Sequence, residues 1–252
     1  MTVTIQSPKN NHIETLSKVI WKALDWLYPA SCCNCGLSDE VLCRDCFSQI
    51  EVLQKNKCVL CGYPISNKRI VCVQCAKTPP VWNQMVSWAV FDGALKKAIH
   101  SLKYHKNLAV GAILAEPLEG LVSQAGWEID LIVPVPLSKS RMRERGYNQS
   151  SWIARPLARK LGVPFSDSSV KRVKQTEKQT SLDVNKRFMN LMDAFYANPA
   201  KLEKRHVLVI DDVITTRATM HHCTLALLKA GAESAFCLSV ARAILRKEKS
   251  EI

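Results

Sequence analysis

The segment from His206 to Thr224 constrains the fold of this 252-residue chain more than any other part of it. An apolar run from Val207 to Ile210 leads into two adjacent carboxylates, and a short threonine-rich loop then precedes a helical pattern. An apolar strand followed by a helix is typical of a buried parallel strand in an α/β sheet. Open sheets of this kind bind ligands in the loops at the carboxyl ends of their strands. We therefore expect a ligand site directly after this strand.

The loop at residues 215–219, here called the threonine loop, has the chemistry of a phosphate site. It offers hydroxyl groups and successive backbone N–H groups at the start of a helix, where orphan donors and partial positive charge favour anions. The acidic pair, Asp211 and Asp212, is then expected to hold ribose hydroxyls or a metal ion that bridges them. The alternative is an ordinary strand whose Asp and Thr side chains cap the next helix, although one carboxylate suffices for a cap. The candidate phosphate-binding residues of the loop are Thr215, Thr216, Arg217, Ala218 and Thr219.

This segment resembles the loop that binds phosphoribosyl pyrophosphate (PRPP) in type I phosphoribosyltransferases. That loop consists of a hydrophobic strand, two acids, a β-branched residue and then T-T-G-x-T, and the same order is found here except that Arg217 stands at the glycine. Glycine permits unusual backbone angles and close approach to phosphate, so a side chain at Arg217 is expected to crowd that approach. The resemblance implies a PRPP site with Mg²⁺, in which Asp211 and Asp212 are the catalytic acids.

The chain carries a formal net charge of +13, although its overall composition is ordinary for a globular protein. This charge indicates a polyanionic partner, either nucleic acid or an acidic membrane surface, with solvated basic faces as the alternative. No apolar run reaches about 18 residues, so no membrane span is predicted. Residues 1–12 lack the layout of a secretory signal, which predicts a cytoplasmic location and leaves peripheral association with the inner membrane open.

Eight of the eleven cysteines form four CxxC pairs within residues 32–75. The CxxC spacing lets two thiolates bind one tetrahedral ion from a tight turn, and two such turns complete a structural zinc site. Zinc is favoured over disulfides because no export signal is present. Sequential pairing predicts one zinc ion for the first four cysteines and one for the second four; interleaved pairing, or a single ion, is left open. The predicted ligands are Cys32, Cys35, Cys43, Cys46, Cys58, Cys61, Cys72 and Cys75, whereas Cys33, Cys223 and Cys237 are not.

Strand and helix patterns alternate along the rest of the chain, which predicts an α/β fold with a parallel sheet flanked by helices. Residues 13–28 are interpreted as an amphipathic helix that packs on the following domain, with a position on a membrane surface as the alternative. Pro117 is expected to interrupt or bend one helix and Pro156 to kink or restart another. Predicted strands cover residues 85–91, 130–137 and 235–241, and predicted helices cover residues 94–107, 109–125, 149–161 and 219–230.

Two basic segments are predicted to be loops. Residues 138–150 carry Arg141, Arg143 and Arg145 in alternation, and guanidinium groups in such a loop bind pyrophosphate or a nucleic-acid backbone, with a solvated basic loop as the equal alternative. Residues 171–190 contain six basic residues and two acids, which predicts a long loop that closes over a phosphorylated substrate or follows a DNA strand.

The chain as a whole resembles the ComF family, and the resemblance covers nearly all of it beyond residue 13. The division expected is a polar segment and helix at residues 1–30, a double zinc ribbon at residues 31–80 and a type I phosphoribosyltransferase-like domain at residues 81–252. The matching motifs are Leu24–Pro29, Cys32–Gly36, Lys103-Tyr104, Val133–Leu137, Arg145–Gln149, Gln179–Leu182, Arg187–Asn190 and Asp211–Thr219.

The ComF resemblance implies a role in natural transformation. In that role the protein handles incoming single-stranded DNA near the inner membrane, alongside a competence helicase and recombination mediator proteins. Such binding needs a basic groove with a few stacking aromatic rings, for which Tyr104 and Tyr147 are candidates unless they are ordinary packing residues. The DNA-binding candidates are Lys103, Tyr104, Arg143, Arg145, Tyr147, Lys171, Arg172, Lys174, Lys178 and Arg187.

The alternative function is an active transferase that moves ribose 5-phosphate from PRPP to a nitrogen base. The threonine loop then holds the 5-phosphate and the acidic pair holds the ribose hydroxyls and Mg²⁺. A third possibility is a zinc-ribbon interaction module whose α/β domain is a scaffold, because a fold does not establish a reaction. The groups expected to neutralise the leaving pyrophosphate are Lys103, Arg141, Arg143 and Arg145.

Overall fold

The structure is a computed structural model that describes residues 30–53, 56–65, 69–174 and 191–244. The helix predicted over residues 13–28 lies outside the described residues. The motifs at residues 179–182 and 187–190 also lie outside them, together with the DNA-binding candidates Lys178 and Arg187.

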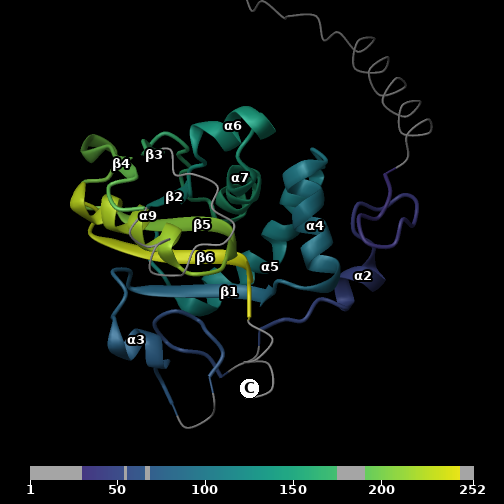
Figure 1. Cartoon of the computed structure of the whole chain (residues 1–252), viewed down its shortest axis with the longest axis horizontal. Coiled ribbons are helices and arrows are strands. Elements are labelled where there is room, and N and C mark those ends of the chain that lie inside the picture. Colours follow the sequence, from purple (N-terminus) through teal and green to yellow (C-terminus); the bar gives the residue numbers. More distant parts are fainter. Residues whose placement is uncertain (1–29, 54–55, 66–68, 175–190, 245–252) are drawn as a thin grey trace, which may run out of the picture.

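A four-stranded parallel sheet forms the centre of the fold, with strand order β1-β6-β5-β2 (Figure 1). The apolar run from Val207 to Ile210 is fully buried in the central strand β5, as expected for a strand that is covered on both faces. β5 extends further than predicted, through the acidic pair to Ile214, because it remains paired with β6. The strands are β1 (Gln84–Val90), β2 (Leu131–Pro134), β5 (His206–Ile214) and β6 (Ser234–Arg242).

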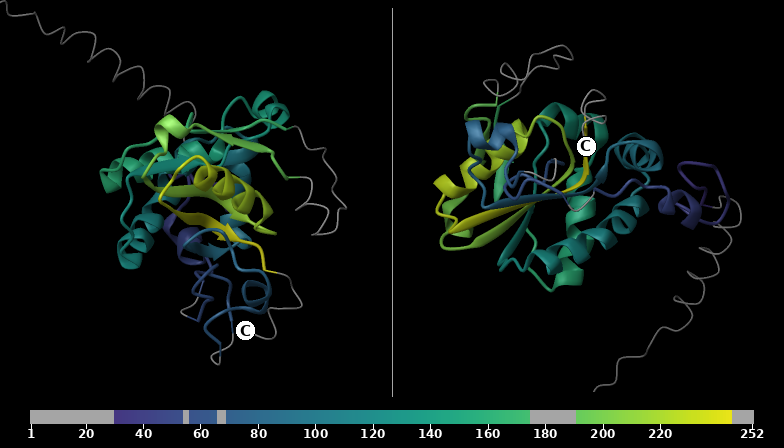
Figure 2. Two further views of the ribbon diagram at one scale, coloured as in Figure 1. Left: turned by 90° about the vertical axis from the view of Figure 1, so that its left-hand side faces the viewer. Right: turned by 90° about the horizontal axis from the view of Figure 1, so that it is seen from below.

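Helices cover both faces of this sheet (Figures 1 and 2). One face carries α4 (Gly93–Tyr104), α5 (Ala109–Ala125) and α7 (Gln149–Leu161), and the other carries α9 (Ala218–Lys229). Both α5 and α7 are assigned as continuous helices through Pro117 and Pro156, so the interruption allowed for at Pro117 is absent. The buried contact of α5 with α7 outweighs the backbone hydrogen bond that a proline removes. None of the described helices is both long enough and apolar enough to cross a membrane.

The arginine-rich segment is a helix and not the predicted loop. Helix α6 (Lys139–Arg145) begins after Ser138, whose side chain accepts a hydrogen bond from Arg141 N, and ends at Gly146 with φ of 81°. Ser before a helix and Gly after it are ordinary end signals. Alternating arginines obscured these signals, because alternation is a pattern of extended chain.

A small antiparallel pair lies beside the main sheet. It consists of β3 (Val170–Arg172) and β4 (Phe195–Ala197), and the 3₁₀ helix η1 (Pro199–Lys201) follows. The loop predicted over residues 171–190 therefore begins within β3, and residues 175–190 lie outside the described residues.

The cysteine-rich segment, with its short helices α2 (Arg44–Ser48) and α3 (Val73–Lys77), covers the outer edge of β1. Cys32, Cys43 and Cys46 pack into the apolar cluster on the α4–α5–α7 side of the sheet, and the last four cysteines of the segment pack into the cluster on the α9 side. An unpaired sheet edge can pair with other chains, and here the cysteine-rich segment forms backbone hydrogen bonds to that edge instead. The backbone hydrogen bonds run from Leu53 N to Trp88 O (3.0 Å), from Val90 N to Glu51 O (2.9 Å) and from Met85 N to Leu60 O (3.1 Å).

Candidate functional site

The acidic pair lies near the carboxyl end of β5, where α4 and α7 converge on it. Ser150 Oγ, in the first turn of α7, donates to Asp211 Oδ1 at 3.1 Å. Asp212 is 4% exposed and forms an ion pair with Lys103 Nζ of α4. The structure therefore brings Lys103, which the sequence predicted as a partner of pyrophosphate or DNA, into direct contact with Asp212.

The electrostatics of this pair favour a bound cation. Burial, followed by the charge of Asp212, raises the pKa of Asp211 to about 7, although Lys103 and the hydrogen bond from Ser150 act in the opposite direction. The charge of Asp212 beside it therefore makes the ionised form of Asp211 costly near neutral pH. A divalent ion, or donors such as ribose hydroxyls, would relieve the repulsion between them.

The threonine loop joins β5 to α9. Thr215 is exposed, Thr216 is half-buried, and Ala218 and Thr219 are the first residues of α9. The loop therefore places backbone N–H groups at the start of a helix of twelve residues, next to the acidic pair. This is the geometry that the sequence predicted for a phosphate site, and its use as one remains a proposal.

Arg217 has the backbone conformation that glycine would adopt at its position. Its φ is 64°, in the left-handed region. Its side chain contacts the cysteine-rich segment and Trp82, and the expected crowding of a phosphate stays a prediction. Nη1 donates to Cys75 Sγ at 2.9 Å, and the guanidinium lies 6.0 Å from the centroid of the Trp82 ring.

The Arg145–Gln149 motif holds the site together instead of presenting a free arginine. Arg145 is 9% exposed, donates from Nη1 to Gln149 Oε1 at 2.7 Å and stacks over the Tyr104 ring at 5.0 Å. Tyr147 donates to the carbonyl of Leu102. Asn148 caps α7 by accepting from Ser150 N, and its Nδ2 donates to Val135 O at 3.0 Å. The motif thereby fixes α7 against α4 and β2, which positions Ser150 and Lys103.

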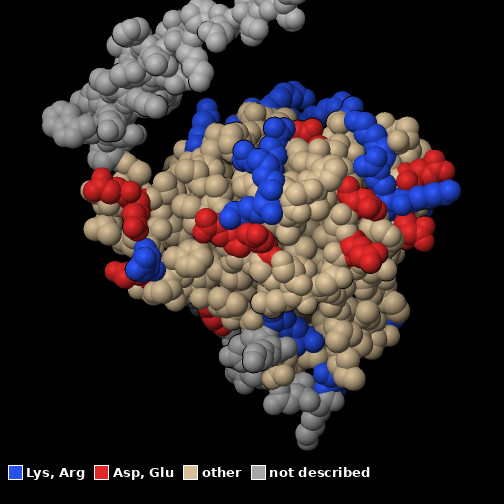
Figure 3. All heavy atoms as spheres, turned by 180° about the vertical axis from the view of Figure 1, so that it is seen from behind, with Lys and Arg blue, Asp and Glu red and all other residues tan. Residues whose placement is uncertain are grey.

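A groove of about 1320 Å³ runs between α6, α7 and β3. Three aromatic residues, Tyr147, Trp152 and Phe165, line it. Asp167, paired with Arg155 at 2.8 Å, is the only carboxylate among the described residues of its lining. We call this feature the basic groove. On the face in Figure 3, Lys and Arg side chains cover much of the upper rim, the end at which Figure 1 places α6, β3 and β4. The basic residues of the groove are Lys139, Arg143, Arg155, Arg159, Lys171 and Arg172.

The predicted DNA-binding residues divide between two places. Those that line the basic groove are Arg143, Tyr147, Lys171 and Arg172, whereas Lys103, Tyr104 and Arg145 lie at the acidic pair and its supporting motif. Arg141 and Lys174 are exposed and do not line the groove, so the three arginines of α6 do not converge on one point. The sequence interpretation missed Trp152, Arg155 and Arg159, although their helical spacing on one face of α7 was a usable signal.

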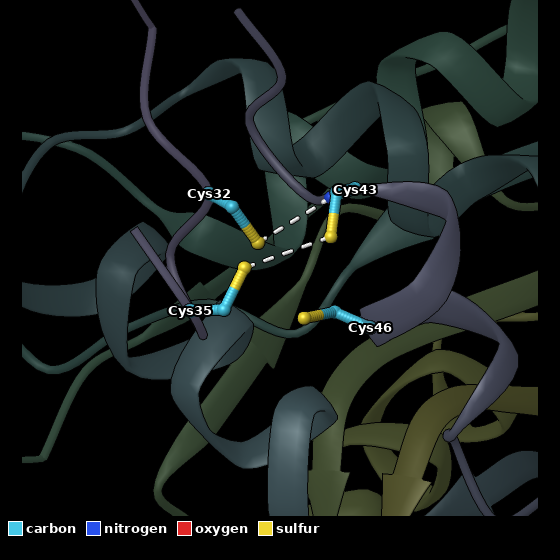
Figure 4. A group of neighbouring side chains, drawn as sticks. All are labelled: Cys32, Cys35, Cys43 and Cys46. Atoms are coloured by element: carbon cyan, nitrogen blue, oxygen red, sulfur yellow. Dashed lines mark hydrogen bonds between the residues drawn. The ribbon is translucent and has the colours of Figure 1, made fainter. Parts of the chain in front are cut away.

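The cysteines form two groups of four, paired in sequence order as predicted. Figure 4 shows that the four sulfur atoms of the first group point toward one another. In each group the potential ligand atoms all lie within 4.8 Å of one another, and Cys33 belongs to neither group. The first cysteine group is Cys32, Cys35, Cys43 and Cys46, and the second cysteine group is Cys58, Cys61, Cys72 and Cys75.

These sulfur groups fit structural zinc. Although burial opposes it, backbone N–H donors lower the pKa of Cys32 to about 6 and that of Cys58 to about 7. Burial raises the pKa of Cys75 to about 11, so a bound cation is needed for all four sulfur atoms of a group to be thiolates together. Gly36 and Gly62, which follow two of the CxxC pairs, have φ of 80° and 63°, as tight metal-binding turns need. Cys223 and Cys237 are fully buried in the core. Four sulfur ligands leave no open position for catalysis.

Comparison with known proteins agrees with this division. A family model of the double zinc ribbon domain matches residues 23–76, and one of the phosphoribosyl transferase domain matches residues 100–252. Competence protein F of Haemophilus influenzae is 33% identical over 217 residues, which cover 83% of this chain and 94% of that protein. The chain belongs to the ComF family.

Other relatives of this ComF-family chain carry related names. DNA utilization protein YhgH of Salmonella typhimurium is 31% identical and covers 81% of the chain and 93% of its own length. Competence protein ComFC of Bacillus subtilis is 27% identical, and the match covers 84% of this chain and 85% of that protein. Among solved structures, adenine phosphoribosyltransferase of Thermoanaerobacter pseudethanolicus is 18% identical, with a TM-score of 0.35 over 54% of this chain and 82% of that one.

Proposed function

We propose that this ComF-family chain is a DNA-utilization protein of natural transformation that binds single-stranded DNA along the basic groove and PRPP with Mg²⁺ at the acidic pair. The observation that carries the proposal is the groove itself, whose described lining includes six Lys or Arg residues, three aromatic residues and one carboxylate. Basic side chains neutralise successive phosphates, and rings stack on bases without regard to sequence. The relatives named for competence and DNA utilization support the biological role.

The proposal separates the two ligands in space. The basic groove contains no residue of the threonine loop and neither member of the acidic pair. PRPP and a DNA strand are therefore expected to bind at the same time. The competence helicase, the recombination mediator proteins, the cytoplasmic location and the peripheral contact with the inner membrane belong to this proposal through the family resemblance.

Anisotropy of a labelled oligothymidylate, titrated with the full chain at several salt concentrations, tests the groove. Trp152 is 40% exposed, so Trp152→Ala leaves the core intact and should weaken binding about tenfold through lost stacking. Arg159→Gln should reduce the slope of log affinity against log salt concentration by about one for the phosphate contact that is lost. Lys229→Gln, an exposed residue at the end of α9, is the matched control and should change neither. If Trp152→Ala and Arg159→Gln both bind like the wild type, the groove is not the DNA site.

The second candidate function is an active phosphoribosyltransferase, and the acidic pair with Lys103 beside the threonine loop favours it. A transferase would release pyrophosphate from PRPP when the correct nitrogen base is added. Pyrophosphate release that depends on one base and is lost in Asp212→Asn would support this function over simple PRPP binding.

A further inference from the structure

Arg217 links the threonine loop to the second cysteine group. Its Nη1 lies 2.9 Å from Cys75 Sγ, and its guanidinium faces the Trp82 ring. Trp82 is 4% exposed and donates from Nε1 to Leu60 O at 2.8 Å, so the cysteine-rich segment fixes the indole as well. Both contacts of this loop side chain therefore depend on the packing around the second cysteine group.

The second cysteine group has a physical reason to hold a guanidinium. Four thiolates around one Zn²⁺ leave a net negative charge, and the four cysteines of this group are at most 8% exposed. A buried charge needs a nearby partner of opposite sign. Two arginines supply it, namely Arg217 at Cys75 and Arg242, which is 2% exposed and donates from Nη2 to Cys61 O.

The loop backbone in turn needs support at Arg217. Residues with a side chain adopt a φ near +64° only where their surroundings hold them there, whereas glycine adopts it freely. The threonine loop contains no glycine. The backbone of Arg217 accepts one hydrogen bond, from His221 N to Arg217 O at 2.8 Å, and its side chain adds the contacts with Cys75 and Trp82, which tie this conformation to the cysteine-rich segment.

We infer that Arg217 is a positioning residue through which the metal-loaded second cysteine group holds the threonine loop in its left-handed conformation. Loss of metal from the second group then loosens the loop, whereas loss of metal from the first group leaves it unchanged. The consequence for ligand binding rests on the function proposed above: metal loss from the second group weakens binding of a phosphorylated ligand such as PRPP.

Hydrogen exchange of the zinc-loaded full chain tests this coupling. Cys72→Ser removes one ligand from the second group without touching Arg217, and Cys35→Ser is the matched change in the first group. Amides of residues 215–219 should exchange about tenfold faster in Cys72→Ser and at the wild-type rate in Cys35→Ser. Equal exchange of the loop in the two variants would overturn the inference.

Two substitutions of Arg217 keep both cysteine groups intact, in case a cysteine variant fails to fold. Arg217→Met keeps the strained backbone and removes the contacts, so loop exchange should accelerate and PRPP affinity should fall about tenfold. Arg217→Gly relieves the strain, so loop exchange should stay near the wild-type rate and no longer respond to Cys72→Ser. Wild-type loop exchange in Arg217→Met would refute the inference. If the exchange results hold while the wild type binds no PRPP, the proposed function fails and the inference stands.

Discussion

Ser150 Oγ donates a hydrogen bond of 3.1 Å to Asp211 Oδ1, joining the first turn of α7 to the carboxyl end of β5. Ser150 is fully buried, and Asn148 fixes its position by capping the same helix. The acidic pair is thus contacted by the hydroxyl of Ser150 from α7 and by the ammonium of Lys103 from α4. This arrangement determines how the site titrates and what its members contribute, and the first two predictions follow from it.

Binding of PRPP with Mg²⁺ should strengthen as pH rises toward about 7 and then level off. The pKa of Asp211 is raised from 3.8 to about 7 by burial, and a cation binds its deprotonated form. The same raised pKa makes the folded state less stable as pH rises from about 4 to about 7. Calorimetry across this range measures the affinity. Ser150→Ala removes a hydrogen bond that lowers the pKa and should move the profile to higher pH; an affinity that is flat with pH would contradict the assignment.

Asp212→Asn should weaken binding of PRPP with Mg²⁺ by about tenfold or more, because a charge–charge contact to the ligand is worth a kcal/mol or two in a desolvated site. The fold should survive, since an amide can still accept from Val213 N, as the carboxylate does at 2.9 Å. The free energy of unfolding should fall by about 1–3 kcal/mol, because Lys103 loses its partner. Calorimetry and urea unfolding give the two quantities. Unchanged affinity would remove this pocket from consideration.

Cys58→Ser should lower the zinc content from two ions per chain to one. Cys58 is 1% exposed and lies within the second cysteine group, where a hydroxyl cannot replace a thiolate ligand. Metal analysis after dialysis measures the loss. Cys33→Ser is the control, because Cys33 belongs to neither group and both ions should remain. Full metal content in Cys58→Ser would show that the ligands are assigned wrongly.

Gly62→Ala should destabilise the protein more than Gly36→Ala, although the two glycines occupy equivalent CxxCG turns. Both have positive φ, so each alanine costs about 1 kcal/mol from backbone strain. A Cβ at Gly62 would also lie 2.7 Å from Met85 O, whereas one at Gly36 meets nothing within 4 Å. Overpacking of this kind adds about 1–3 kcal/mol. Urea unfolding compares the pair, and equal losses would mean that the second ribbon does not press on β1 as the structure shows.

The sequence predicted the elements whose patterns are local. The buried run of β5 and the ranges of α5 and α7 follow from apolar periodicity and end signals, and both cysteine groups follow from spacing alone. Helix α6 was wrongly predicted as a loop, because its alternating arginines outweighed the serine and glycine at its ends. Its arginines face different surroundings, which a sequence pattern does not reveal.

The site was predictable only in part, for a related reason. Asp211, Asp212 and the threonine loop are adjacent in sequence, so one motif contains them. The roles of Ser150 and Asn148 depend on the position of α7 beside β5, and that of Arg217 depends on a cysteine 142 residues earlier. Contacts between distant segments leave no spacing rule in a single sequence.

The position of β1 has a consequence for synthesis of the chain on the ribosome. Its strand neighbour is β6, so Gln84 cannot pair with Phe236 until β6 has been synthesised. The other edge of β1 is hydrogen-bonded to Glu51, Leu53 and Leu60, which are synthesised before it. Nascent chains with long-range strand pairing expose edges on which they aggregate. The cysteine-rich segment can load its metal and cover one side of β1 during this interval. It thus protects one edge of the incomplete sheet from aggregation. We therefore expect zinc shortage during growth to lower the yield of newly folded protein, even where protein that has already folded keeps its zinc.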